Sequence, residues 1–374
     1  MSRAAPPPML PGYEQALGAC VYCPKLCRAY CPVSNANGSE TLTPWGKMST
    51  AYFLHRGDVP RDSTHGAPVW ACTGCGACRE RCEHRNDVAH TLLAARAGLC
   101  LAGAGHPAAR AAGARFPRHL ATVRERLDEW AGASPHGART GLLVGCSYVR
   151  HATDAARAVL EVGRALLPGP LKILRSCCGL PLLLAGERQG FADAAAQLCA
   201  ELGGLERVVV ADPGCARTLR EELPRIGLRT PPVNLLVEEV AAALGRLPAG
   251  RLDGLRVRYH DACQLSRSLD CVAAPRAILT HLTGQPPAEL PRHGRLAECA
   301  GAGGLLPLTF PELSRAIADA RLAEHRAAGG GLLVTACGAS LHRLRTRGAE
   351  ALDLMSLVVR TLAGGREDDD GRAR

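Results

Sequence analysis

The chain has 374 residues, of which 47% are hydrophobic and only 3% aromatic, so it is long enough for two or three domains with buried cores. No run of about 18 apolar residues occurs, which excludes a transmembrane helix within this sequence. The net charge of +10 does not indicate nucleic-acid binding, because the 45 basic residues are almost all arginines and are spread along the chain rather than clustered.

Two tight runs of cysteines stand out in the N-terminal part of the sequence. In chain order they read Cys20-x2-Cys23-x3-Cys27-x3-Cys31 and Cys72-x2-Cys75-x2-Cys78-x3-Cys82. Three thiolates in one loop, with a fourth three residues further on, is the spacing that holds a 4Fe-4S cluster, and in proteins with two clusters the fourth cysteine of each run ligates the other cluster. We therefore expect two 4Fe-4S clusters, one held by Cys20, Cys23, Cys27 and Cys82, and the other by Cys72, Cys75, Cys78 and Cys31.

Zinc and disulfide bonds are the competing interpretations of these cysteines. A structural zinc site draws its ligands from two well-separated pairs, whereas here three or four cysteines share one loop. Disulfides are disfavoured because the first twenty residues contain no long apolar stretch typical of an export signal, so we expect a reducing cytoplasm. The first run has one additional residue between Cys23 and Cys27, and the second lacks a proline after Cys82.

Helices are predicted around the cysteine runs. Pro44 is a start signal for a helix over residues 45–56, and apolar residues at helical spacing predict another helix over residues 87–101. We therefore expect a small, mostly helical dicluster ferredoxin-like domain over residues 13–103, followed by a linker over residues 104–139 with one charged helix. The proline-rich residues 1–12 and the charged residues 364–374 predict disorder.

From residue 140 onward, short β-rich runs alternate with longer helical segments. Strands are predicted at residues 141–145, 171–174, 207–211, 256–259 and 331–334, and helices at residues 152–167, 191–203, 275–282 and 311–328. This alternation predicts two tandem α/β domains with largely parallel sheets, over residues 140–250 and 251–363. The fold class expected for the whole chain is therefore α+β and multidomain.

Cysteines recur in the two α/β domains at a similar spacing. The first domain contains Cys146, Cys177, Cys178 and Cys215, and the second contains Cys263, Cys299 and Cys337. Most of them follow predicted strands, and the carboxyl ends of strands in an open sheet line the crevice where ligands bind. We expect them to bind a cofactor, with neighbouring glycines, namely Gly145, Gly179, Gly214, Gly301, Gly303 and Gly304, admitting a bulky inorganic group. The isolated Cys100, Cys199 and Cys271 are interpreted as small core residues.

Together these motifs resemble the iron–sulfur subunits of the heterodisulfide reductase and glycolate oxidase family. The resemblance is carried by Cys72-Thr-Gly-Cys-Gly-Ala-Cys78, Ser176-Cys-Cys-Gly179, Tyr259-His-Asp-Ala-Cys263 and Glu298-Cys-Ala-Gly-Ala-Gly-Gly304. It implies a two-cluster ferredoxin-like module followed by two cysteine-rich "CCG" domains.

The chain departs from the fullest form of that pattern, which has one cysteine, a Cys-Cys pair and a final Cys-x2-Cys in each domain. Asp212, Ala300 and Ser340 stand where cysteines would be, although an alternative register sets Cys337 opposite Cys215 instead of Asp212. Three interpretations stay open: a further cluster in the first domain, a cluster shared between the domains, or a degenerate site that only shapes a docking crevice. His260 is either a proton-handling neighbour of such a site or a histidine satisfied by backbone.

The resemblance implies an electron-transfer subunit of a flavin-dependent oxidoreductase, of the 2-hydroxy-acid or glycerol-3-phosphate dehydrogenase type. The flavoprotein is expected to be a separate subunit, because no Gly-x-Gly-x-x-Gly motif opens a strand–helix unit in this chain. The alternatives are a disulfide reductase that uses a cluster in the first CCG domain, and a non-redox module stabilised by metal. The sequence identifies no catalytic residue and no electron acceptor, and it leaves open whether a partner brings the chain to a membrane.

Overall fold

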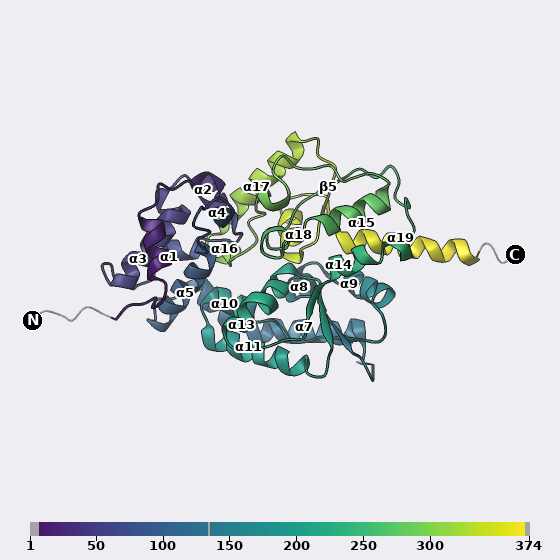
Figure 1. Cartoon of the computed structure of the whole chain (residues 1–374), viewed down its shortest axis with the longest axis horizontal. Helices are drawn as coiled ribbons and strands as arrows, with labels where there is room; N and C mark the ends of the chain where they lie inside the picture. The colour runs from purple at the N-terminus through teal and green to yellow at the C-terminus, as the bar shows by residue number, and fades with distance from the viewer. Residues whose placement is uncertain (1–6, 134, 371–374) are drawn as a thin grey trace, which may run out of the picture. The chain divides into compact units, whose positions relative to one another are not determined.

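The chain, described by a computed structural model over residues 7–133 and 135–370, forms two compact units. The first comprises the described part of Met1–Pro117 together with Gly179–Ala192 and Glu298–Arg321. The second comprises the described parts of Arg118–Cys178, Asp193–Ala297 and Leu322–Arg374. Two short segments of the cysteine-rich region therefore belong with the N-terminal unit. Figure 1 shows the elements in chain order by colour.

The first unit is helical, as its sequence pattern predicts. Its helices are α1 (Glu14–Val21), α2 (Pro32–Asn37), α3 (Pro44–Arg56), α4 (Ala77–Glu80), α5 (Val88–Leu101), α6 (Pro107–Ala114), α10 (Leu180–Ala185) and α16 (Leu306–Thr309). Helix α3 begins at Pro44 because the Thr43 hydroxyl accepts the Gly46 N–H at 2.9 Å, and it ends at Gly57, whose φ of 80° suits glycine. Its core is built from buried side chains of α1, α3 and α5, among them Leu17, Met48, Leu54, Leu92 and Leu99.

The second unit contains two parallel sheets. The first has the order β2-β1-β3-β4, from β1 (Thr140–Leu143), β2 (Leu171–Ile173), β3 (Arg207–Val210) and β4 (Val233–Leu235). The second has the order β5-β6-β7, from β5 (Val257–Tyr259), β6 (Leu332–Thr335) and β7 (Ala351–Asp353). In register, Gly141 lies opposite both Lys172 and Val208, and Arg258 lies opposite Leu333. The predicted combination of a helical region with parallel α/β domains is confirmed.

Helices alternate with these strands. Those after β1 and β2 are α8 (Cys146–His151), α9 (Thr153–Leu166) and α11 (Arg188–Glu201), followed after β3 and β4 by α12 (Pro213–Arg217), α13 (Leu223–Arg225) and α14 (Leu236–Ala242). Those around the second sheet are α15 (Ala273–Thr283), α17 (Pro311–Ala327), α18 (Gly338–Arg345) and α19 (Leu354–Asp370), and α7 (Phe116–Ala131) precedes the first sheet. Single π-helical turns follow α12 at Thr218–Glu222 and Cys263 at Gln264–Ser268.

The predictions of terminal disorder are wrong where the structure describes those residues. Leu10 is buried in the core of the first unit, and the Leu10 N–H donates to His55 Nδ1 at 3.0 Å, which fixes the entry of the chain. Residues 364–370 continue α19. Residues 1–6 and 371–374 lie outside the described residues.

Candidate functional site

The first predicted ligand set lies between the two cysteine runs. Burial raises the pKa of Cys20 to about 12, and the next influences on it are Cys27, Cys82 and Cys23. Burial likewise raises the pKa of Cys27 to about 11, with Cys23 as the next cause. The four thiols therefore lie within electrostatic range of one another. The Asn86 amide donates to Cys20 Sγ at 3.1 Å and to the Ala16 carbonyl at 2.7 Å.

The second predicted ligand set surrounds a small pocket. Cys31, Cys72, Cys75 and Cys78 all line it, together with Lys47 from α3. The loop over residues 72–78, here called the cysteine loop, wraps this pocket. It can do so because Gly74 and Gly76 adopt φ values of 69° and 72°, which residues with side chains rarely adopt. Burial raises the pKa of Cys78 well above its ordinary value, and Cys75, Cys31 and Cys72 raise it further.

Two buried cations adjoin this second set. The Lys47 ammonium donates to the Ala71 carbonyl at 2.8 Å and lies 3.6 Å from Cys31 Sγ. The Arg96 guanidinium is also buried and donates to backbone carbonyls that converge from three segments, namely those of Val69, Trp70, Cys72, Leu184 and Gly304. Arg96 thus fixes the backbone at the start of the cysteine loop.

The donor chemistry of both sets fits iron–sulfur clusters. Soft thiolates in groups of four suit Fe–S clusters, and the cluster's positive iron ions would offset both the burial and the mutual repulsion that raise these thiol pKa values. Within residues 7–133 and 135–370, no three His, Cys, Asp or Glu side chains converge closely enough to bind a single metal ion. A cluster needs no such convergence, because each thiolate binds a different iron atom.

A third group of thiols forms at the carboxyl edge of the first sheet. Cys146 follows β1, the pair Cys177 and Cys178 follows β2, and Cys215 lies in α12 after β3. Cys178 Sγ and Cys215 Sγ are 3.4 Å apart. Hydrogen bonds with Cys146 and then Cys178 raise the pKa of Cys177 well above its ordinary value. The adjacency of β2, β1 and β3 brings these four thiols together.

Asp212 joins this third group, and the ligand prediction did not include it. Its Oδ1 accepts the Gly214 and Cys215 N–H groups at 2.9 and 3.3 Å, which caps α12. Its Oδ2 is buried without a hydrogen-bond partner in the described structure. Burial, and then Cys178, raise the pKa of this carboxyl to about 6. The signal was present in the sequence, since Asp212 occupies a position where the family pattern has cysteine.

The cysteines of the second CCG domain do not form an equivalent set within one compact unit. Burial, and then Asp212, raise the pKa of Cys337 to about 12, so Cys337 lies near the third group. Cys299 belongs to the first unit and Cys263 to the second. Of the isolated cysteines, Cys271 is buried, as expected of a core residue, whereas Cys100 and Cys199 are only partly buried.

Several glycines beside these cysteines lie close to other protein atoms. A Cβ on Gly145 would lie 2.4 Å from Asp212 Cβ, and one on Gly179 would lie 2.8 Å from the Phe191 ring. A Cβ on Gly304 would lie 1.9 Å from the Cys72 carbonyl oxygen. Close packing against protein atoms is therefore sufficient to require glycine at these three positions, and the expectation that they also admit a cluster stays a prediction.

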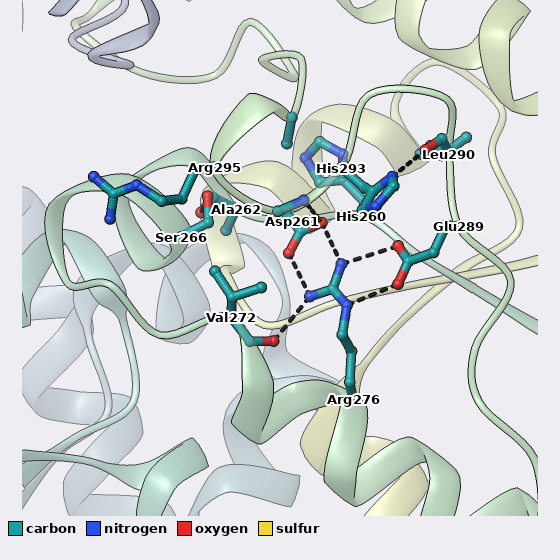
Figure 2. Close-up of polar contacts among 12 residues, drawn as sticks. His260, Asp261, Ala262, Ser266, Val272, Arg276, Glu289, Leu290, His293 and Arg295 are labelled. Carbon is teal, nitrogen blue, oxygen red and sulfur yellow. Dashed lines mark hydrogen bonds and ion pairs between the residues drawn. The ribbon is translucent and has the colours of Figure 1, made fainter. Parts of the chain in front are cut away.

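A buried ion network follows β5, next to His260 (Figure 2). Asp261 accepts two hydrogen bonds from Arg276, at 2.9 and 2.8 Å, and the Gly294 N–H at 2.7 Å. Glu289 binds the same guanidinium at 2.7 and 2.9 Å. The His260 N–H donates to the Val334 carbonyl at 2.8 Å, and the His260 carbonyl accepts the Thr335 hydroxyl at 3.0 Å. Asp261 thus anchors the loop that reaches Gly294.

Comparison with known proteins identifies the parts of the chain. A family profile described as a 4Fe-4S dicluster domain matches residues 16–86, and one described as a cysteine-rich domain matches residues 140–220 and 257–344. No helix in the described part of the chain combines the length and apolar character needed to cross a membrane.

Three curated proteins illustrate the similarity. One subunit of the fumarate reductase (CoM/CoB) of Methanothermobacter marburgensis is 26% identical over 86% of this chain, and the match covers 66% of that protein, slightly less than two thirds. One subunit of the dihydromethanophenazine:CoB–CoM heterodisulfide reductase of Methanosarcina barkeri is 25% identical over 92% of this chain and 94% of that protein. Lactate utilization protein A of Geobacillus kaustophilus is 24% identical over 54% of this chain and 89% of that protein.

Proposed function

We propose that this chain transfers electrons within an oxidoreductase complex whose substrate is oxidised by a separate flavoprotein. The chain belongs to the heterodisulfide reductase and glycolate oxidase type of iron–sulfur subunits, which combine a dicluster domain with two cysteine-rich domains. The observation that carries the proposal is that the first unit contains two sets of four thiols. Each set takes three cysteines from one run and one from the other, so each spans both halves of the dicluster domain.

The chain's own residues have defined tasks in this proposal. Cys20, Cys23, Cys27 and Cys82 would hold one 4Fe-4S cluster, and Cys31, Cys72, Cys75 and Cys78 the other. Such clusters supply one-electron transfer when bound. Burial of the second set limits access of water, Asn86 offers a hydrogen bond to Cys20 sulfur, and Arg96 holds the loop that begins at Cys72.

The proposed substrate class and partner rest on similarity. The lactate utilization protein supports a 2-hydroxy acid or a related metabolite as the substrate, and the reductase subunits support a complex with a partner subunit. The flavin would reside on the partner and would collect the two electrons that this chain passes on singly.

A disulfide reductase is the second candidate, and the third thiol group favours it. Cys146, Cys177, Cys178 and Cys215 provide four soft donors, and the unpartnered Asp212 Oδ2 provides a fifth, harder one. A further cluster held there would be the place for a disulfide to bind, which accords with the similarity to the heterodisulfide reductase of Methanosarcina barkeri.

Metal analysis of anaerobically purified protein tests these proposals. About eight iron atoms per chain fit two 4Fe-4S clusters, and about twelve add a third. Cys75→Ser should remove iron from the dicluster domain, Cys178→Ser should affect only a third cluster, and Cys199→Ser, at an isolated cysteine, is the matched control. Zinc without iron would overturn electron transfer. Cluster EPR signals that change when a disulfide substrate is added would favour the reductase.

A further inference from the structure

Lys47 is a buried ammonium that lies beside the second ligand set. Its side chain lies on α3 and the residue is 1% exposed, although lysine is rarely buried without a compensating charge. Within the described residues, no ion pair joins Lys47 to a carboxylate. Its contacts are instead the Ala71 carbonyl at 2.8 Å and Cys31 Sγ at 3.6 Å.

A cluster held by the second ligand set would supply the compensating negative charge. Lys47 lines the same pocket as Cys31, Cys72, Cys75 and Cys78. The same four cysteines are the ones proposed to hold a cluster. The ammonium is thus held as a fixed positive charge against this set, and the hydrogen bond to Ala71 fixes its position.

The first ligand set has no equivalent cation among the described residues. After burial, the largest influences on Cys20 and Cys27 come from other cysteines, and the side-chain donor to Cys20 is the neutral Asn86 amide. The nearest lysine in sequence, Lys25, is partly exposed, lies 3.5 Å from Glu40 and stacks on the Trp45 ring at 4.3 Å. Lys25 is therefore screened by water and neutralised by its own partner.

We propose that Lys47 raises the reduction potential of the cluster held by Cys31, Cys72, Cys75 and Cys78 above that of the cluster held by Cys20, Cys23, Cys27 and Cys82. Reduction adds one negative charge, and a cation in a poorly solvated site stabilises the more negative state. If both clusters were bound, a single electron shared by the two sites would leave the first cluster, oxidising it by one electron, and would reduce the second by one electron, with no proton or further reactant involved. This inference rests on the proposed function.

An EPR-monitored redox titration with dithionite under anaerobic conditions tests the role of Lys47. In Lys47→Met, the reduced-to-oxidised ratio of the higher-potential cluster should fall at least tenfold at a fixed ambient potential, which equals a downward shift of about 59 mV for one electron. Lys47→Arg keeps the charge and should restore most of the shift. Lys25→Met and Lys172→Met remove the other two lysines and should leave both potentials close to those of the native protein.

The outcomes separate this inference from the proposed function. Native protein without iron overturns the proposed function, whereas full iron in Lys47→Met with unchanged potentials overturns only the role of Lys47. If Lys47→Met does not bind iron, Cys23→Ser and Cys75→Ser decide which site is reduced first. The inference expects Cys75→Ser to remove or shift the higher-potential step and Cys23→Ser the lower one, and the reverse assignment overturns it.

Discussion

The buried network around Arg276 allows a direct test of how burial sets the strength of an ion pair. Asp261 and Glu289 bind the same guanidinium (Figure 2). The two ion pairs have similar distances, but the Asp261 side chain is 1% exposed and the Glu289 side chain is 33% exposed. We consider Asp261→Asn, which keeps the size of the side chain and removes its charge. The Asn amide cannot accept every donor that Asp261 accepts, namely two N–H groups of Arg276 and the Gly294 N–H.

The expected cost of Asp261→Asn follows from that burial. Removing one partner of a buried pair destabilises a protein by about 3–5 kcal/mol. Because Arg276 keeps Glu289 as a counter-ion, we expect a loss near the lower limit, about 3 kcal/mol. Glu289→Gln should cost only about 1 kcal/mol, since water replaces part of the lost interaction at this more exposed carboxylate.

The same unit offers a matched control. Asp154 binds Arg345 through two hydrogen bonds of 2.9 and 2.8 Å, but its side chain is 56% exposed. Asp154→Asn should therefore cost less than about 1 kcal/mol despite its similar geometry. Urea unfolding followed by circular dichroism gives the overall loss, and hydrogen exchange of peptides that contain Gly294 gives the local one. Equal losses for Asp261→Asn and Asp154→Asn would refute the argument from burial.

Three further predictions concern the first unit and the second sheet. Arg96→Met should lower the free energy of unfolding by about 3 kcal/mol and reduce the iron content, because the substitution leaves buried carbonyls unpaired. Thermal unfolding and iron analysis measure these two effects, and a stability and iron content equal to those of the native protein would contradict the prediction. Gly304→Ala should be more destabilising than Gly330→Ala in the same unfolding assay, since both have positive φ but only the former places a Cβ against the Cys72 carbonyl. Burial raises the pKa of Asp353 from 3.8 to about 7, so the folded chain binds more protons than the unfolded chain between these pH values. The contribution of protonated Asp353 to stability is therefore full below about pH 4 and is lost as the pH rises through 7. That contribution is about 4 kcal/mol. In Asp353→Asn, the urea midpoint of unfolding should depend less on pH over this range, and the same pH dependence as in the native protein would contradict the raised pKa of Asp353.

The sequence was sufficient to predict the longer elements of the fold. The strands β1 and β3 are apolar runs beside glycine and polar residues, and α3 and α5 have recognisable starts at Pro44 and Asp87. The strands β4 and β7 were not predicted, because each is short and contains a residue type that is depleted in strands, Asn234 in β4 and Asp353 in β7. Their neighbours β3 and β6 stabilise them in the sheet, which no local pattern reveals.

The candidate site likewise has parts that the sequence predicts and parts that it does not. Cysteine spacing is a local signal, so the sequence could indicate both ligand sets of the dicluster domain. Lys47 shows no such signal, because it becomes significant only when α3 packs beside Cys31 and the Ala71 carbonyl. The inclusion of residues 179–192 and 298–321 in the first unit was equally hidden, since it depends on contacts such as those of Arg96 with distant carbonyls.

The glycine-rich stretch after Cys299 shows why a motif does not by itself establish a ligand site. Within the first unit, a Cβ on Gly303 would lie 2.3 Å from the Thr73 carbonyl oxygen, and one on Gly304 would lie still closer to that of Cys72. The Gly304 carbonyl in turn accepts the Arg96 guanidinium at 2.9 Å. These glycines therefore support the cysteine loop whether or not Cys299 binds iron. Substituting Cys299 alone should leave the loop intact, whereas a side chain at either glycine should displace it.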